Sequence, residues 1–360
     1  MLEKQLKTRQ ICLFFVAFLT ITKLFTLPST IAGVCFNDLY LASFFNILLD
    51  GVTLILLLVL SKNNDKTFYE ILEDALGKIG AKIICAFYVV YFFTKSLLPI
   101  IEQKEYIELT LYIPNPSFLY FLPFFIVAIY ISAKKLRILG RLSDVLFASS
   151  IIGFIVLMAL SVPHADFSNL LPFGVNGLKQ ILSGSFLSLA WFGDTLYFLF
   201  FIGNFKRQKK DGKKIFLSYL FSALSVILFM MVFYGIFSSI AFRQKFSLTE
   251  ISKYTTIINS TGRFDYFAIL LLLVSNLVAI TLPIFFCCSL VNYIFNLKNR
   301  YISPLIINGL IVTLMLSLEE FVFSTQKLVI TIFGVFFLIM SNILPVFLLL
   351  LNKRRKNENS

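Results

Sequence analysis

The chain has 360 residues, of which 58% are hydrophobic and 14% are charged, and its formal net charge is +13. A water-soluble chain carries about 25% charged residues, so this composition excludes a soluble globular protein. Because a membrane-spanning helix uses about 20 apolar residues, the apolar content suffices for roughly ten such helices and leaves no room for a folded domain outside the membrane.

Ten apolar stretches follow one another along the chain and predict an all-α integral membrane protein with about ten transmembrane helices. The expected spans are 11–34, 38–60, 82–110, 118–133, 142–162, 182–203, 215–242, 264–296, 302–319 and 328–351. An even number of spans places both termini on the same side of the membrane. Residues 1–360 are therefore expected to form a single transmembrane domain.

Lys and Arg are distributed unevenly between the two sets of loops. The termini and alternating loops on one side carry 23 of the 32, and the opposite loops carry six. Positively charged loops are retained in the cytoplasm, so both termini are expected there. This asymmetry, together with contact with anionic membrane lipids, accounts for the net charge without nucleic-acid binding. The first helix, although it resembles a signal peptide, is expected to remain uncleaved, because its removal would upset the even number of spans.

Residues 66–82, between the second and third spans, predict an amphipathic helix on the cytoplasmic membrane surface. Its apolar residues recur at helical spacing, and charged residues occupy the other face. The apolar positions are Phe68, Ile71, Leu72, Ala75, Leu76 and Ile79. Such a helix places its apolar side among the lipid headgroups. A plain connector packed on the bundle and a contact surface for a partner are both open interpretations.

Two charged residues fall inside expected spans. Lys23 lies in span one, within TITKLFTLP, and Asp194 lies in span six, after Gly184 and Gly193. A charge at mid-bilayer costs roughly 2.5–3.5 kcal/mol on insertion scales. Each of the two is therefore expected to face protein, water or an opposite charge rather than lipid.

Both charges are expected near the central plane of the membrane, because each lies about 20 Å along its helix from the face at which that helix enters. The two helices enter from opposite faces, which predicts two inverted five-helix repeats, residues 1–162 and 163–360. Transporters with inverted repeats bind substrate between discontinuous helices, here helices 1 and 6. Gly, Pro, Ser and Thr clusters in both helices permit such breaks.

Lys23 and Asp194 allow two interpretations. In one, they form a structural ion pair that joins helix one to helix six. In the other, one or both contact a ligand or ion at a central site. Replacement of Asp194 by Ala would abolish ligand binding only under the second interpretation.

Other charged residues in the spans give weaker signals. Lys95 in span three is either a cation in a central cavity or a side chain that extends toward Glu102. The repeat of Glu102, Glu105 and Glu108 at every third position is typical of a solvated helix face, and Asp50 is expected to pair within the bundle. In span eight, Ser275 and Asn276 either line the cavity or form interhelical hydrogen bonds.

The expected ligand-binding residues share a position near the middle of the membrane or next to a helix break. They are Thr22, Lys23, Thr26, Lys95, Gly193, Asp194, Ser275 and Asn276. The five cysteines include no CxxC pair, and the chain has a single histidine, His164. No metal site, disulfide framework or cofactor is indicated, and catalysis is not expected.

Several motifs in their order along the chain resemble one family. They are RQICLFF and LPSTIAGVCFNDLY within 9–40, FYEILEDALGKIG at 68–80, YIPNP at 112–116, LRILGRLSD at 136–144, NLLPFGVNG at 169–177, FGD at 192–194 and GRFD at 262–265. The chain thereby resembles, nearly end to end, the spore germination permeases, which are the integral-membrane B subunits of nutrient germinant receptors. These are similar to amino acid/polyamine/organocation transporters.

The resemblance implies a subunit in the inner membrane of a bacterial spore that binds a small germinant, such as an amino acid, and signals germination. Its implied partners are the receptor A subunit and the lipoprotein C subunit. The chain differs from the family at two positions: Thr22-Lys23 stands where a small residue is usual, and Gly193-Asp194 replaces the frequent Gly-Glu. A secondary active amino-acid or cation transporter and a membrane scaffold are the alternative functions.

Overall fold

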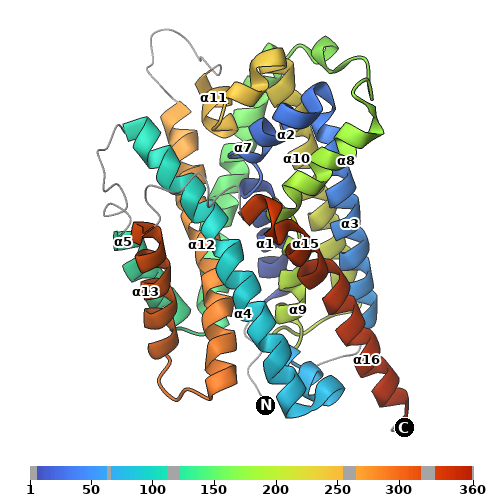
Figure 1. The fold of residues 1–360 in the computed structure, drawn as a ribbon, viewed down its shortest axis with the longest axis vertical. Helices are drawn as coiled ribbons and strands as arrows, with labels where there is room; N and C mark the ends of the chain where they lie inside the picture. The colour runs from blue at the N-terminus through green and yellow to red at the C-terminus, as the bar shows by residue number, and fades with distance from the viewer. Residues whose placement is uncertain (1–5, 63–65, 112–121, 254–264, 318–328, 359–360) are drawn as a thin grey trace.

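A computed structural model of the chain describes residues 6–62, 66–111, 122–253, 265–317 and 329–358. Within these ranges the regular structure is helical, apart from one isolated bridge between Leu6 and Phe205. This confirms the expected all-α class. The helices form an elongated bundle (Figure 1).

The helices follow the expected apolar stretches in chain order. In the first half they are α1 Thr8–Ile21, α2 Leu27–Cys35, α3 Leu39–Leu60, α4 Phe68–Leu111, α5 Leu122–Ser132, α6 Leu136–Leu142 and α7 Ala148–Ser161. In the second half they are α8 Gly177–Leu187, α9 Tyr197–Phe201, α10 Asp211–Phe237, α11 Ser247–Lys253, α12 Asp265–Phe295, α13 Ile302–Ser317, α15 Phe333–Leu338 and α16 Leu344–Glu358.

Seven segments of the described chain are long and apolar enough to cross a membrane. Three further apolar helices, α1, α5 and α13, are shorter. Helices α5 and α13 fall inside expected spans, and α1 overlaps the first one. The protein is therefore a multi-pass membrane protein. The division into two inverted repeats stays a prediction.

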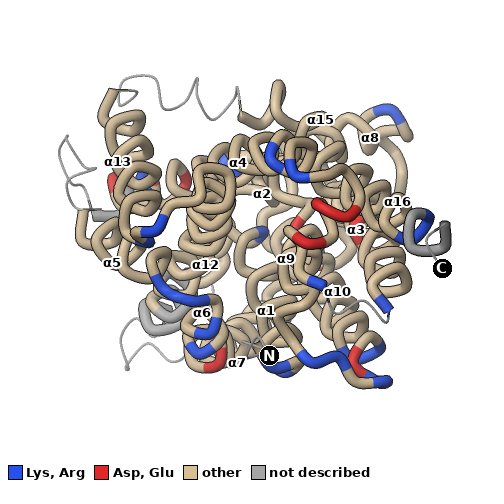
Figure 2. The backbone as a smooth tube through the Cα atoms, turned by 90° about the horizontal axis from the view of Figure 1, so that it is seen from below, with Lys and Arg blue, Asp and Glu red and all other residues tan. Residues whose placement is uncertain are grey.

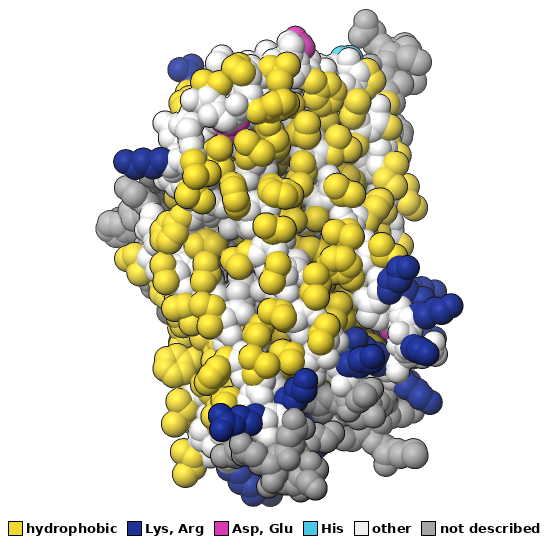
Figure 3. Space-filling view, turned by 90° about the vertical axis from the view of Figure 1, so that its right-hand side faces the viewer, with side chains coloured by type: hydrophobic (Ala, Val, Ile, Leu, Met, Phe, Trp, Pro, Cys, Tyr) yellow, Lys and Arg dark blue, Asp and Glu magenta, His cyan; other side chains and the backbone are white. Residues whose placement is uncertain are grey.

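Helix α3 shows how apolar and polar residues are distributed on a membrane-spanning helix of this bundle. Leu48, Val52 and Val59 recur at helical spacing and are about half-exposed or more, whereas Asn46 and Asp50 on the other side are buried. This pattern is the reverse of a soluble amphipathic helix, since its polar groups face the protein interior. A broad apolar surface covers the middle of the molecule in Figure 3.

Both termini lie at the same end of the bundle (Figure 1). Viewed from that end, Lys and Arg are distributed around much of the molecule (Figure 2), and they also gather at this end of the face shown in Figure 3. The charge asymmetry of the sequence thus becomes an asymmetry between the two ends of the structure.

The segment at 66–82 differs from the expected single amphipathic helix. Its first turn begins after Thr67, whose N–H and hydroxyl both donate to the Glu70 carboxylate. The backbone at Gly77 is non-helical, with φ 73° and ψ 172°. Phe68 is buried, whereas Ile79, which helical periodicity places on the same face, is 79% exposed. The expected face therefore ends at Gly77, because a left-handed residue redirects the helix axis.

An aromatic layer centred on Phe92 crosses the interior of the bundle. The Phe92 ring centroid lies 5.6 Å from that of Tyr197, 5.1 Å from that of Phe200 and 5.6 Å from that of Phe286. These side chains come from α4, α9 and α12 and are fully buried or nearly so. The layer joins three helices that are distant in sequence.

Candidate functional site

The first expected helix is broken between α1 and α2, at residues 22–26. The hydroxyls of Thr20 and Thr22 donate to carbonyls one turn earlier, which closes the end of α1. Pro28 stands in the first turn of α2, where its missing N–H is tolerated. Thr26 stands at the junction with α2. The sequence therefore supplies both an end for the first helix and a start for the second.

The second break lies between α8 and α9. One 3₁₀ turn, Ser188–Trp191, leads into an extended Phe192 and a left-handed Gly193 with φ 84°, and a second turn begins at Asp194. The freed Gly193 N–H donates to Asp50 Oδ2 at 2.9 Å. A Cβ at this position would lie 2.5 Å from Ser341 Oγ, so both the backbone angle and the close packing require glycine.

A cluster of three charged side chains joins the two breaks. Lys23 Nζ lies 2.6 Å from Asp194 Oδ2, and Lys95 Nζ lies 3.3 Å from Asp194 Oδ1. The side chains of Lys23 and Asp194 are only 3% and 1% exposed. The structure therefore brings together three of the charged residues expected at the central site, with one carboxylate between two ammonium groups.

Lys95 also satisfies backbone groups that the second break leaves without helical partners. Its Nζ donates to the Ala190 carbonyl at 2.9 Å and to the Phe192 carbonyl at 2.5 Å. Of the two interpretations of Lys95, the structure favours a cation in the central cluster, because its side chain is directed toward the second break rather than toward Glu102. One side chain thus supports both the charge balance and the conformation of the unwound segment.

Glu102 is buried, so the expectation of a solvated face formed by Glu102, Glu105 and Glu108 is wrong for this residue. Its Oε1 accepts from the Thr26 hydroxyl and from Trp191 Nε1, the latter at 2.8 Å. Glu105 is buried as well and pairs with Lys245 at 2.8 Å. A signal for Glu102 did exist, since it lies seven residues after Lys95 and therefore on the same face of α4.

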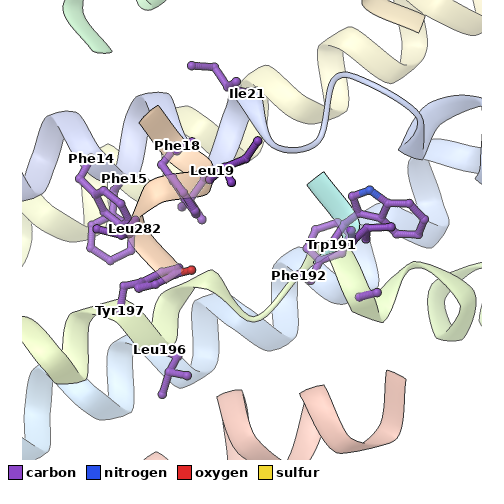
Figure 4. Close-up of a cluster of buried hydrophobic side chains, with 14 of the residues drawn as sticks. Phe14, Phe15, Phe18, Leu19, Ile21, Trp191, Phe192, Leu196, Tyr197 and Leu282 are labelled. Carbon is purple, nitrogen blue, oxygen red and sulfur yellow. The ribbon is translucent and has the colours of Figure 1, made fainter. Parts of the chain in front are cut away.

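A small cavity lies beside the charged cluster. Thr22, Lys95, Glu102, Trp191 and Asp194 contribute to its lining. Its volume, about 30 Å³, has room for one or two water molecules and not for a larger solute. Figure 4 shows aromatic side chains on both sides of the unwound segment, with Phe18 and Tyr197 on one side and Trp191 and Phe192 on the other. In this structure the cavity is therefore too small to hold an amino acid.

Ser275 and Asn276 lie away from this cavity. Ser275 Oγ forms a hydrogen bond with Ser150 Oγ and donates to the Leu146 carbonyl at 3.1 Å. Asn276 Nδ2 donates to Gln103 Oε1 at 3.0 Å. Neither residue is part of the cavity lining, so their contacts are those of the interhelical hydrogen bonds that were the alternative interpretation.

Of the remaining expected site residues, Thr22 lines the cavity, Gly193 forms the second break, and Thr26 is bound to Glu102. Across the described part of the chain, no three His, Cys, Asp or Glu side chains gather closely enough to hold a metal ion. The motif at 112–116 and the first three residues of the motif at 262–265 lie outside the described residues.

A family model described as "Spore germination protein" matches residues 5–321, which is most of the chain. The chain belongs to the spore germination protein family. This membership confirms the resemblance that the motifs indicated. A search among curated proteins finds no match.

The fold is similar to solved structures of a manganese transporter from Eremococcus coleocola. Two mutants of that transporter, with a histidine or a glutamate replaced by alanine, superpose with TM-scores of 0.58 and 0.57 at 13% sequence identity. The same transporter in complex with an aromatic bis-isothiourea substituted compound gives 0.55. Each comparison covers 94% of this chain and 78% of the transporter. The family and the fold together indicate a permease-like membrane protein.

Proposed function

We propose that this chain is the integral-membrane subunit of a nutrient germinant receptor and binds a small germinant at the two helix breaks. The observation that carries this proposal is the position of Asp194 between Lys23 and Lys95, at the point where both helices unwind. A buried charged cluster is costly in a membrane and is expected where function requires it. The cluster lies at two helix breaks, and transporters that have discontinuous helices bind substrate at such breaks, which supports the proposal.

An amino acid is the ligand class that fits this charge pattern. Its carboxylate can replace Asp194 as the partner of Lys23 or Lys95, and its ammonium group can be received by the carboxylates of Asp194 and Glu102. In this structure Lys23 and Asp194 form an ion pair with each other. Binding of an amino acid must therefore separate the two side chains and enlarge the cavity. The ligand then shifts the population from this conformation toward one with a larger cavity, which is sufficient for sensing.

A divalent metal is a poor fit to the same cluster. Hard cations require several oxygen ligands. Here, two ammonium groups already surround the one carboxylate of Asp194. We therefore do not propose manganese as a ligand of this chain, although the structurally similar transporter is a manganese transporter.

The proposal extends to the partners and the cellular location. We propose that the chain works with a receptor A subunit and a lipoprotein C subunit in the spore inner membrane, with both termini in the cytoplasm. Family membership supports the partners and the location. The gathering of Lys and Arg at the end that holds both termini supports the orientation.

Trp191 provides the test, because it is the single tryptophan of the chain and lines the cavity. The purified protein is titrated with amino acids, nucleosides and sugars while tryptophan emission is recorded. We expect a saturable change with one class of ligand, and we expect Lys23→Ala to abolish it. A Trp191→Phe variant provides the blank. A response that is equal in wild type and Lys23→Ala would remove the proposed site.

Transport is the second candidate function, and the similarity to a transporter over 94% of the chain favours it. The two functions differ in a measurement on the chain alone. Concentrative uptake of a binding ligand into liposomes that contain only this protein would identify a transporter. Binding without uptake would identify a sensor.

A further inference from the structure

A second cavity of the described structure is separate from the central site. Its volume is about 370 Å³. Residues from the start of α4, the end of α5, the end of α9 and the last turns of α12 contribute to its lining, so it opens at the end of the bundle that holds both termini. The aromatic layer separates it from the central cavity, because Phe200 and Phe286 line one side while Tyr197 lines the other.

The mouth of this cavity is positively charged. Lys134, Lys135 and Arg300 contribute to its lining, and no carboxylate of the described residues does. Within the described chain, neither Lys135 nor Arg300 forms an ion pair with an acidic side chain, and both are exposed. The cavity therefore offers two uncompensated cations to an anion.

The mouth also carries the kinds of residue that are typical of the lipid headgroup region. Lys134 Nζ lies 4.6 Å from the ring centroid of Tyr130 and 3.4 Å from the Tyr301 hydroxyl. Tyr130 is 55% exposed and Tyr301 is 44% exposed. Exposed tyrosines beside a lysine are typical of the membrane–water interface. On the same helix, Ile126 is 69% exposed, as expected of a residue in contact with acyl chains.

The inner wall of the cavity has both apolar and polar character. Phe200, Phe285 and Phe286 form an apolar side. Asn292 contributes a side-chain carbonyl, Oδ1, that is buried and has no hydrogen-bond partner within the described chain. Such an acceptor is costly unless a ligand or water donates to it. The cavity thus fits a group that combines an anion with an apolar body.

We propose that this cavity binds the phosphate group of an anionic phospholipid, with Lys135 and Arg300 as its cationic contacts. Basic pockets between transmembrane helices at the cytoplasmic side recognise such headgroups. A soluble phosphate compound offers the same anionic chemistry without the acyl chains. The apolar wall and the interfacial tyrosines favour the lipid as the source.

The test compares two double variants of the full chain purified in detergent. Lys135→Gln/Arg300→Gln removes the cations at the cavity. Lys209→Gln/Lys213→Gln, called the loop variant, removes one exposed cation from the loop that precedes α10 and one from the first turn of α10. It therefore makes the same change in net charge. Each protein is titrated with phosphatidylglycerol, with phosphatidylcholine and with inorganic phosphate. Bound lipid is counted by native mass spectrometry, and thermal unfolding is followed in parallel.

We expect wild type and the loop variant to bind phosphatidylglycerol more tightly than phosphatidylcholine. We expect the cavity variant to bind phosphatidylglycerol about thirtyfold more weakly, since each cation near the membrane surface contributes a factor of about five. Equal binding by the cavity and loop variants would overturn the proposal, as would equal binding of the two lipids. Stabilisation by inorganic phosphate that depends on Lys135 and Arg300, without lipid preference, would assign the site to a soluble phosphate compound and overturn the lipid as its source.

Discussion

Lys23 and Asp194 are separated by 171 positions in the sequence, yet the ammonium nitrogen of one lies 2.6 Å from a carboxylate oxygen of the other. Each stands in the unwound part of a different broken helix. Together with Lys95, the contact places two cations and one anion in an almost inaccessible interior. The free energy by which these ion pairs stabilise the protein is therefore also the free energy that must be supplied to separate them.

Asp194→Asn should destabilise the protein by about 3–5 kcal/mol, because it removes the ion-pair partner of two buried ammonium groups. Thermal unfolding in detergent measures the loss. Asp144→Asn is the matched control, since Asp144 pairs with an exposed Arg9 at 2.9 Å and such a surface pair contributes about 1 kcal/mol or less. An equal loss of stability in the two variants would contradict the prediction, because it would mean that the buried carboxylate contributes no more than the surface one.

Lys23→Met should cost less stability than Asp194→Asn. After the first change, Asp194 still has Lys95 at 3.3 Å, whereas after the second change neither lysine has its partner. The comparison uses the same unfolding measurement. If the order is reversed, Lys95 does not share the carboxylate in the way that the distances indicate.

Glu102→Ala should destabilise the protein by about 4 kcal/mol, and Glu102→Gln by about 1 kcal/mol or less. The alanine variant leaves the donors of Thr26 and Trp191 buried without an acceptor, whereas glutamine retains an oxygen for both. Unfolding is followed by the emission of Trp191. Glu250→Ala serves as the control, because the Glu250–Lys253 pair is partly exposed. A glutamine variant as unstable as the alanine variant would mean that the charge, rather than the acceptor, is required.

Gly193→Ala should cost about 3 kcal/mol, and Gly174→Ala about 1 kcal/mol. Both glycines have positive φ, 84° and 70°, so both variants are strained. Only Gly193 is closely packed, since a Cβ there would overlap Ser341 while nothing lies within 4 Å at Gly174. The difference in unfolding free energy between the two variants measures the cost of the close contact with Ser341. Equal costs would show that Ser341 moves aside freely.

The orientation in the membrane can be tested with two exposed positions at opposite ends of the bundle. In a variant whose five cysteines are replaced, a membrane-impermeant maleimide applied to intact cells should label Lys179→Cys and not Lys209→Cys. The expectation follows from retention of positively charged loops in the cytoplasm. After permeabilisation both should be labelled. The opposite pattern in intact cells would place both termini outside.

The sequence predicted the fold class for a physical reason, and it named an ion pair between Lys23 and Asp194 as one of two interpretations, which is the contact that the structure shows. Charges inside apolar spans must find partners, and Gly, Pro and Thr clusters mark where helices can break. It did not predict the burial of Glu102, because periodicity shows which residues share a face but not which face points inward. Nor did it predict the turn at Gly77 or the small volume of the central cavity, since both depend on packing between segments distant in sequence.

The charged cluster also has a consequence for how the protein is made. The chain is synthesised from its N-terminus, so Lys23 and Lys95 are complete well before Asp194 exists. The two carbonyl groups that receive Lys95 belong to the same late segment. During biogenesis the earlier helices must therefore hold two lysines in a watery or temporary environment, and they reach their final packing only when the sixth span arrives.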